Sequence, residues 1–287
     1  MNPRRTLRGG LIVWALCAGL AACSQPVKTP SKPTTAAAQE DVEAAKEAYD
    51  DGNFADAAQH YRKAAELGDA QAQNNLATLY YAGQGVPQDY AQAAAWYRKS
   101  AEQGYAGAQY NLAVAYHEGL GVPQDYDQAA VWLRKAAELG DAQAQYNLGF
   151  TYDEGQGVPQ DYALSAFWFA KSAEQGYARA QFALAAAYIA GQGVPRDYAL
   201  AVRWFRKAAE QGHTGAQYNL GVCYEEGQGV AKDYVQAADW YRVAAEHGNA
   251  KAQHALGHLY ETGRGVKRNA ELAKEWKSEA MKQNYEP

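Results

Sequence analysis

The sequence predicts an all-α protein in which antiparallel helix pairs stack into a solenoid. Two observations predict this class. Glycine pairs recur every 36 residues from Gly83/Gly85 to Gly263/Gly265, and a valine follows each pair. The tryptophans after Trp14 keep the same step, at Trp96, Trp132, Trp168, Trp204, Trp240 and Trp276. Chance would not hold both markers in phase over six copies, so the repeat is the unit of structure.

The first 22 residues have the features of a signal peptide of the lipoprotein type and are excluded from the fold. Three arginines precede an apolar stretch over 11–20. That stretch is too short to span a bilayer as a stable helix. The alternative is an ordinary signal peptide followed by an incidental cysteine.

The leader ends in Leu20-Ala21-Ala22-Cys23, which resembles the lipobox of bacterial lipoproteins. That resemblance implies a diacylglycerol on the thiol of Cys23 and an outer-membrane lipoprotein, because Ser24 is not the aspartate of the retention signal. The proline-containing range 23–39 is predicted to be a flexible tether. We therefore expect a periplasm-facing chain that meets the membrane of the cell envelope only through its N-terminal lipid.

The charge balance excludes some partners. Removing the three leader arginines changes the net charge from −5 to −8. An acidic surface argues against nucleic acid and anionic lipid as partners. Once Cys23 is acylated, Cys223 stands alone, so no intrachain disulfide is available and we read Cys223 as a packing residue. We expect a monomer.

The first helix of each repeat is predicted from a single apolar face. Gly83 is placed to end it in the left-handed conformation, where glycine is favoured. In the first 36-residue copy the face consists of Ala72, Gln73, Leu76, Ala77 and Tyr80.

The second helix is predicted to begin at Asp89, with Gln92 at the capping-box position. It ends at Gly104. Trp96, Tyr97 and Ala101 are expected to point inward, and Arg98 and Lys99 outward.

The ends of the array differ from its middle, as a solenoid requires. Residues 40–69 form a shorter N-terminal hairpin, and residues 70–285 hold six repeats. In the last copy, Lys274 and Lys277 replace residues that are apolar in the other copies. This copy is therefore predicted to be the C-terminal cap.

The repeat unit resembles the Sel1-like repeat, a relative of the tetratricopeptide repeat. The resemblance rests on the segment Gly-Tyr-Ala-Gly-Ala-Gln-Tyr-Asn-Leu that begins at Gly104, on Gly-x-Gly-Val-Pro-x-Asp-Tyr, and on Ala-x-x-Trp-Tyr-Arg-Lys-Ala. It covers 70–285, while 40–69 resembles a tetratricopeptide repeat proper. It implies a right-handed α-solenoid whose first helices line a concave surface, and a scaffold or adaptor role. The helix-linking cysteines of some secreted members are missing here.

If the first helices line that surface, three positions on each helix lie opposite its buried face. We expect these positions to bind a protein or peptide ligand. The asparagines among them either grip a peptide backbone or bond to the neighbouring repeat. The candidates are Asn75, Asn111, Asn147 and Asn219; Thr78, Val114, Phe150, Val222 and His258; and Tyr81, His117, Asp153, Ile189, Glu225 and Glu261.

Other patterns leave two interpretations each. Acidic residues near the first-helix C-termini are either neutralised by residues such as Arg98 or form an acidic rim for a basic partner. His254 and His258 are four residues apart and could share a metal, but His254 occupies a packing position, so we expect no metal site. The tryptophans could stack on sugars, but their strict period favours core packing.

The candidate functions are an adaptor for proteins, a binder of glycan or peptidoglycan, and a hydrolase. No Ser-x-x-Lys, Gly-x-Ser-x-Gly or His-Glu-x-x-His motif occurs. The Gly-x-Gly pairs follow helices rather than strands, so they are caps and not phosphate cradles. The sequence therefore predicts a non-catalytic scaffold without catalytic residues or cofactor, with glycan binding as the alternative.

Overall fold

A computed structural model describes residues 35–283 and Tyr285 of the 287-residue chain. The predicted signal peptide 1–22, the lipidation site Cys23 and most of the predicted tether lie outside the described residues. The described part divides into two compact units, one ending at Asp161 and the other beginning at Tyr162.

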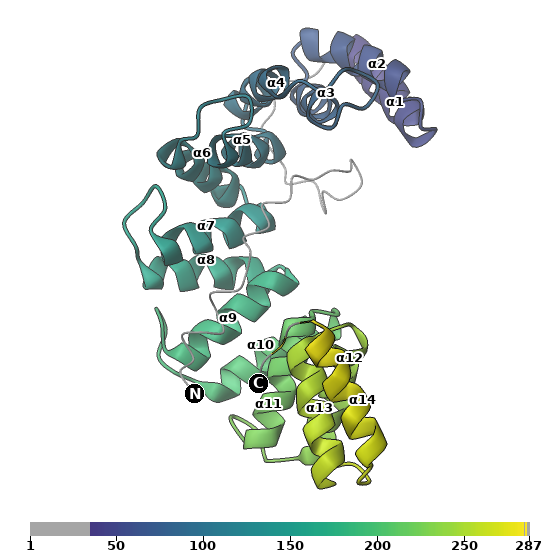
Figure 1. Cartoon of the computed structure of the whole chain (residues 1–287). Coiled ribbons are helices and arrows are strands. Elements are labelled where there is room, and N and C mark those ends of the chain that lie inside the picture. The colour runs from purple at the N-terminus through teal and green to yellow at the C-terminus, as the bar shows by residue number, and fades with distance from the viewer. Residues whose placement is uncertain (1–34, 284, 286–287) are drawn as a thin grey trace. The chain divides into compact units, whose positions relative to one another are not determined.

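The N-terminal unit consists of seven α-helices, each packed on its neighbour in the chain (Figure 1). They are α1 (Ala36–Asp50), α2 (Phe54–Glu66), α3 (Ala70–Ala82), α4 (Tyr90–Glu102), α5 (Ala106–Glu118), α6 (Tyr126–Glu138) and α7 (Ala142–Glu154).

The C-terminal unit repeats this arrangement with another seven helices (Figure 1). They are α8 (Tyr162–Glu174), α9 (Ala178–Ala190), α10 (Tyr198–Glu210), α11 (Thr214–Glu226), α12 (Tyr234–Glu246), α13 (Ala250–Thr262) and α14 (Ala270–Lys282). The predicted all-α solenoid of helix pairs is confirmed. Among the described helices, none is long and apolar enough to cross a membrane.

Helix α1 begins earlier than the sequence analysis placed it. The helix starts at Ala36, inside the range assigned to the tether. The Thr35 side chain caps it by accepting a hydrogen bond from the Ala38 amide at 3.3 Å. The consecutive alanines that follow are the best helix formers, and Val42 and Ala45 are buried in the same core cluster as α2. The end of the tether at residue 39 was therefore wrong.

The two glycines of each pair have different structural roles. Gly83 adopts φ 68° as the left-handed cap of α3, as predicted. Gly85 also has positive φ, and a Cβ at this position would collide with the backbone carbonyl of Phe54 at the start of α2. The second glycine therefore allows one repeat to approach the preceding one closely.

The repeated polar residues are used inside the scaffold. Asp89 caps α4 by accepting from the Gln92 amide at 2.9 Å, as the sequence predicted. The Gln73 amide donates to the carbonyl of Ala65 at 3.0 Å, which joins α3 to the end of α2. The same bond recurs from Gln109, Gln145, Gln181, Gln217 and Gln253.

The tryptophans of the repeats are partly buried, and in three of them a lysine covers one face of the ring. Trp96 is partly buried against the core, and the ammonium of Lys99 lies 3.8 Å from its ring centroid. Trp132 and Trp204 are covered in the same way by the lysine one turn later. These rings support the core interpretation over the sugar-stacking one.

Candidate protein-binding surface

We call residues at equivalent positions of successive repeats a column. The asparagine column consists of Asn75, Asn111, Asn147 and Asn219, and its members in the N-terminal unit are buried. The Asn111 amide donates to Asn74 Oδ1 at 3.1 Å, and the Asn147 amide donates to the Tyr110 hydroxyl at 3.0 Å. Both bonds join adjacent first helices, so these asparagines bond to the neighbouring repeat, which is one of the two roles expected from the sequence.

The C-terminal unit breaks this pattern for a chemical reason. Asn219 follows a repeat in which Phe182 stands where Tyr110 stands earlier, and a phenyl ring has no oxygen to accept the bond. The Asn219 amide instead donates to the carbonyl of Gly215 in its own helix, at 2.8 Å. Ala183 and Ala255 occupy the same column. The asparagine column therefore links adjacent repeats only where an acceptor is present.

The second candidate column becomes more exposed towards the C-terminus. Thr78 and Val114 are buried, and the Thr78 hydroxyl lies 3.1 Å from the Tyr97 hydroxyl of α4. Phe150 and Val222 are partly buried, whereas His258 is exposed. The buried members support the fold, and we do not include them in the binding surface.

The third column, which we call the variable column, offers the most accessible candidates. It consists of Tyr81, His117, Asp153, Ile189, Glu225 and Glu261, of which five are partly buried and Glu261 is exposed. Each lies in the last turn of its helix. Within each unit, neighbouring repeats carry different side chains at this position, except that Glu225 and Glu261 are both glutamates.

In the N-terminal unit a recurring contact holds this column in place. The Gln88 amide donates to the Tyr81 carbonyl at 2.8 Å and to the Tyr90 hydroxyl at 3.0 Å. The rings of Tyr81 and Tyr90 pack at 5.1 Å. Sequence reasoning missed this role of the glutamine, although its recurrence at Gln124 and Gln160 was a visible signal.

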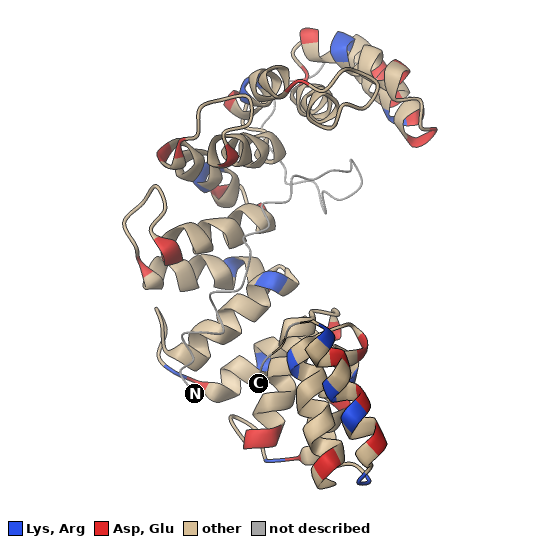
Figure 2. Ribbon diagram, in the orientation of Figure 1, with Lys and Arg blue, Asp and Glu red and all other residues tan. Residues whose placement is uncertain are grey.

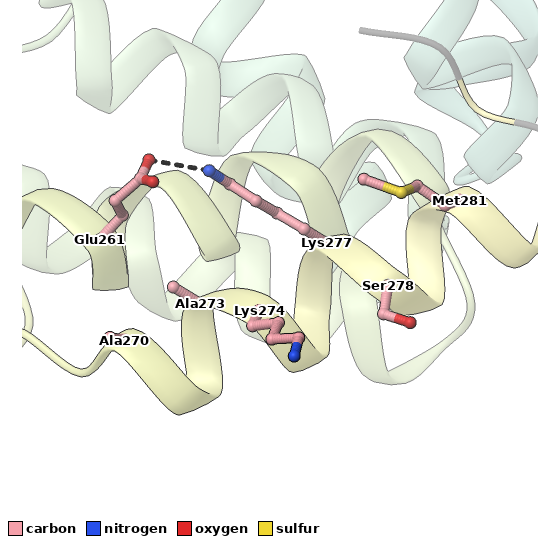
Figure 3. A pocket seen from close by; sticks show the side chains of 7 residues that line it. All are labelled: Glu261, Ala270, Ala273, Lys274, Lys277, Ser278 and Met281. Atoms are coloured by element: carbon pink, nitrogen blue, oxygen red, sulfur yellow. Dashed lines mark hydrogen bonds and ion pairs between the residues drawn. The ribbon is translucent and has the colours of Figure 1, made fainter.

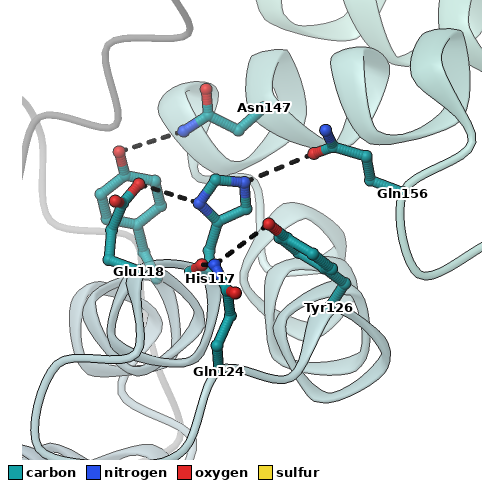
Figure 4. A network of polar contacts seen from close by, with 7 residues as sticks. His117, Glu118, Gln124, Tyr126, Asn147 and Gln156 are labelled. Atoms are coloured by element: carbon teal, nitrogen blue, oxygen red, sulfur yellow. Dashed lines mark hydrogen bonds and ion pairs between the residues drawn. The ribbon is translucent and has the colours of Figure 1, made fainter.

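His117 carries the same contact and adds two more (Figure 4). Its Nδ1 lies 2.8 Å from Glu118 Oε1, and its Nε2 lies 3.4 Å from Gln156 Oε1 in the next repeat. The ring packs on Tyr126 at 5.1 Å. The imidazole is thus fixed in orientation by groups from both its own repeat and the next.

Asp153 is the third member of the column in this unit. Burial raises the pKa of its carboxyl above the usual value, and the neighbouring Glu154 adds to the effect. No cation in the described part of the chain contributes to this shift.

In the C-terminal unit the variable column is tied to second helices. Glu225 accepts a hydrogen bond from the Tyr241 hydroxyl of α12 at 2.7 Å, and burial together with this carboxylate raises the pKa of Tyr241. Glu261 accepts from the Lys277 ammonium of α14 at 2.7 Å (Figure 3). Lys277, in the predicted C-terminal cap, therefore forms an ion pair with a member of the variable column.

The Arg98-type residues contact tyrosines at the ends of the first helices, and within the described chain no ion pair with the acidic residues there tests the suggested neutralisation. Arg98 donates instead to the Tyr116 hydroxyl of the next repeat at 2.7 Å. Arg62, Arg134 and Arg206 make the same bond to Tyr80, Tyr152 and Tyr224. The carboxylates at the first-helix ends find other partners or face solvent, which leaves the rim interpretation open.

The two histidines of α13 do not form a shared site. His254 packs its ring 5.6 Å from that of Tyr285, and His258 Nδ1 lies 3.6 Å from Glu261 Oε2. Over the part of the chain that the structure describes, no cluster of three His, Cys, Asp or Glu residues is placed to hold a metal ion.

The comparisons with known proteins agree with this architecture. The family model described as Sel1 repeat matches seven successive segments. The first match falls on the hairpin likened above to a tetratricopeptide repeat. The segments are residues 49–69, 70–105, 106–141, 142–177, 178–213, 214–249 and 250–285. No curated protein matches the chain.

Two solved structures are similar over most of the chain. One is a protective antigen present in uropathogenic Escherichia coli strains and displaying an SLR fold, with 39% identity and a TM-score of 0.82. The match covers 86% of this chain and 54% of the antigen, so this chain spans about half the antigen's length. The other is a Sel1 repeat protein from Oxalobacter formigenes, with 32% identity, a TM-score of 0.74, and coverage of 86% and 99%. The chain therefore belongs to the Sel1 repeat family.

Proposed function

We propose that this chain is a non-catalytic adaptor lipoprotein of the bacterial cell envelope that binds a protein or peptide partner through the variable column. Sel1 repeat proteins generally mediate protein–protein interactions. One observation carries the proposal. The residues that repeat are used for internal hydrogen bonds and packing, while the column that changes from repeat to repeat keeps access to solvent.

The chemistry of the column suggests how a partner is recognised. Tyr81 and His117 offer rings with polar edges, and tyrosine is enriched at protein interfaces. Glu225 and Glu261 offer carboxylates, each already bonded on one side. In the N-terminal unit the rings suit an aromatic or apolar part of a partner, and in the C-terminal unit the carboxylates suit a basic part.

The envelope location is part of the proposal and rests on the sequence. The segment Leu20-Ala21-Ala22-Cys23 supports acylation at Cys23. An outer-membrane anchor with the repeats facing the periplasm follows from it. Labelling with a radioactive or clickable fatty acid tests this part: loss of label in Cys23→Ala supports it, and retained label contradicts it.

The non-catalytic part is supported by where the nucleophilic groups lie. Ser100 is buried and its hydroxyl donates to the Ala70 carbonyl at 2.6 Å. Burial raises the pKa of the Cys223 thiol to about 12, which leaves it protonated and a poor nucleophile at neutral pH. Turnover of a β-lactam or peptidoglycan substrate that is lost on one side-chain change would contradict a purely adaptor role.

Glycan or peptidoglycan binding is the second candidate, favoured by one observation. The Tyr81–Tyr90 and His117–Tyr126 ring pairs lie one repeat apart and are partly solvent-accessible. Accessible aromatic rings present apolar faces on which a sugar ring can stack.

One experiment separates the two candidates. Wild-type protein and a Tyr81→Ala/His117→Ala/Glu225→Ala variant are used to capture proteins from envelope extracts and, separately, to bind purified peptidoglycan. A protein partner retained by the wild type and lost by the variant supports the adaptor. Retention on peptidoglycan without a protein partner supports the glycan alternative. A Gln92→Ala/Val131→Ala/Arg203→Ala variant, altered on the exposed faces of second helices, is the matched control.

A further inference from the structure

The loops that follow the first helices change charge along the chain. In the N-terminal unit they carry glutamine before the capping aspartate, as in Gln88-Asp89. In the C-terminal unit that glutamine becomes Arg196, Lys232 and Arg268 in turn. Figure 2 shows Lys and Arg in blue on the loop between α13 and α14. The positive charge thus gathers at the end of an acidic protein.

The last loop differs most from its equivalents. Arg264 and Lys267 stand where the first repeat has Gln84 and Pro87. The cap of α14 is Asn269, a neutral residue at the aspartate position. This loop therefore holds three cations and no carboxylate.

The preceding loop joins this cluster through one ring. Tyr234 lies between two cations, with the Lys232 ammonium 5.0 Å and the Arg264 guanidinium 5.5 Å from its centroid. We call Lys232, Arg264, Lys267 and Arg268 the basic edge; all four are exposed. In the described chain none of these four forms an ion pair with a carboxylate.

The neighbouring acidic residues are largely engaged. Glu226 accepts from the Gln228 amide at 2.5 Å, and Asp233 caps α12 by accepting from the Val235 and Gln236 amides. Glu271, exposed in the first turn of α14, is the third carboxylate nearby. In the described chain none of these three carboxylates forms an ion pair with the basic edge, so its cations face solvent.

A shallow hollow adjoins the basic edge. Lys267 and Arg268 line it, together with Tyr260, Val266 and Leu272. Arg242 also lines it and is held by Asp239 at 2.9 Å. The hollow thus combines apolar lining with two cations of the basic edge.

We propose that the basic edge and its hollow are a second docking surface, which takes an acidic protein segment carrying an apolar side chain. The carboxylates of the segment would pair with Arg264, Lys267 and Arg268, and its apolar side chain would enter the hollow. The net charge of −8 that remains once the three leader arginines are removed from −5 favours a narrow segment over a flat anionic membrane, because a membrane would also meet the acidic remainder of the chain. This surface contains no residue of the variable column, so it can be tested independently of the proposed function.

The test measures binding of a fluorescein-labelled peptide of repeated Glu-Glu-Leu units by anisotropy at low salt. The variant Arg264→Gln/Lys267→Gln/Arg268→Gln introduces the glutamines that the early repeats use. The control Lys63→Gln/Arg203→Gln/Lys251→Gln removes the same charge elsewhere. Circular dichroism verifies that both variants are folded.

We expect the edge variant to bind the acidic peptide about tenfold more weakly than wild type, and the control variant to bind within about twofold. Binding by wild type should weaken with added salt. Equal binding by the edge variant, or equal binding of a Gln-Gln-Leu peptide, overturns the proposal. Phosphatidylglycerol vesicles that bind the wild type and displace the peptide overturn it in favour of a membrane. A Tyr81→Ala/His117→Ala/Glu225→Ala variant should bind the peptide normally, which separates this surface from the variable column.

Discussion

In the N-terminal unit the first helices are joined to one another by side-chain amides, whereas in the C-terminal unit carboxylates join them to second helices. Asn111 and Asn147 reach the preceding first helix. Glu225 and Glu261 reach α12 and α14 instead. The backbone plan is the same in both units, so the side chains, rather than the backbone, decide which helices these contacts join.

Substitutions in the repeat scaffold, which both units share, should have the largest effect on the free energy of unfolding. The effect should be equal in the two units. Gly121→Ala and Gly229→Ala each place a Cβ against the carbonyl of the preceding second helix, at positive φ. We expect each to lower the free energy of unfolding by about 3 kcal/mol. Gly104→Ala, also at positive φ but in open space, should cost about 1 kcal/mol. Urea unfolding followed by circular dichroism measures all three, and a large difference between the first two variants would break the shared-scaffold comparison.

The asparagine column tests the difference between the units directly. Asn147→Ala removes a buried bond between repeats and should cost about 1–2 kcal/mol. Asn219→Ala removes a partly buried bond within one helix and should cost less than about 0.5 kcal/mol. Equal losses in the same unfolding assay would show that the column plays one role throughout.

Acid should destabilise helix α11 more than the equivalent first helices of the N-terminal unit. His213 caps α11 by accepting from the Ala216 amide at 3.1 Å, and its ring stacks on Phe182 at 4.6 Å. Burial and the nearby Arg179 lower its pKa, so the fold favours the neutral ring. Stability from this cap is present above the ordinary pKa of about 6.5 and is lost as the pH falls through the lowered value.

The matched change is His213→Asp, because Asp141 caps α7 at the equivalent position. We expect it to stabilise α11 by about 1 kcal/mol at pH values below the histidine transition, and to remove the transition itself. Hydrogen exchange of the α11 amides across the pH range measures this. An unchanged pH profile would exclude His213 as its source.

The smallest expected effect concerns Asp153. Because burial and Glu154 raise its pKa, the ionised carboxylate opposes folding, and stability falls as the pH rises from the ordinary aspartate pKa through the raised one. Asp153→Asn should therefore raise the thermal midpoint slightly at neutral pH and leave it unchanged below the aspartate range. If Asp153 contacts the partner as a member of the variable column, the same variant should bind the partner more weakly. Lower stability at neutral pH would contradict this assignment.

Much of the fold could be predicted, because its determinants are local and repeat in register. Gly83, Asp89 and Trp96 act through their own turn, cap or packing position, so their spacing was sufficient. The partners of Asn147 and Arg98 lie 37 and 18 residues away, and nothing in a single sequence specifies that Tyr110 and Tyr116 accept those bonds. Candidate columns could be counted along a helix, but the burial of Thr78 and Val114 depends on neighbours in space.

Site-specific photo-crosslinking in living cells tests most directly the claim that the variable column meets the partner. A crosslinking residue is placed singly at Tyr81, His117 and Glu225, and in parallel at Gln92, Val131 and Arg203 on second helices. The account predicts that the first three positions capture the same protein and that the second three do not. Capture of that protein mainly from the second-helix positions, or of none from the first three, would contradict it.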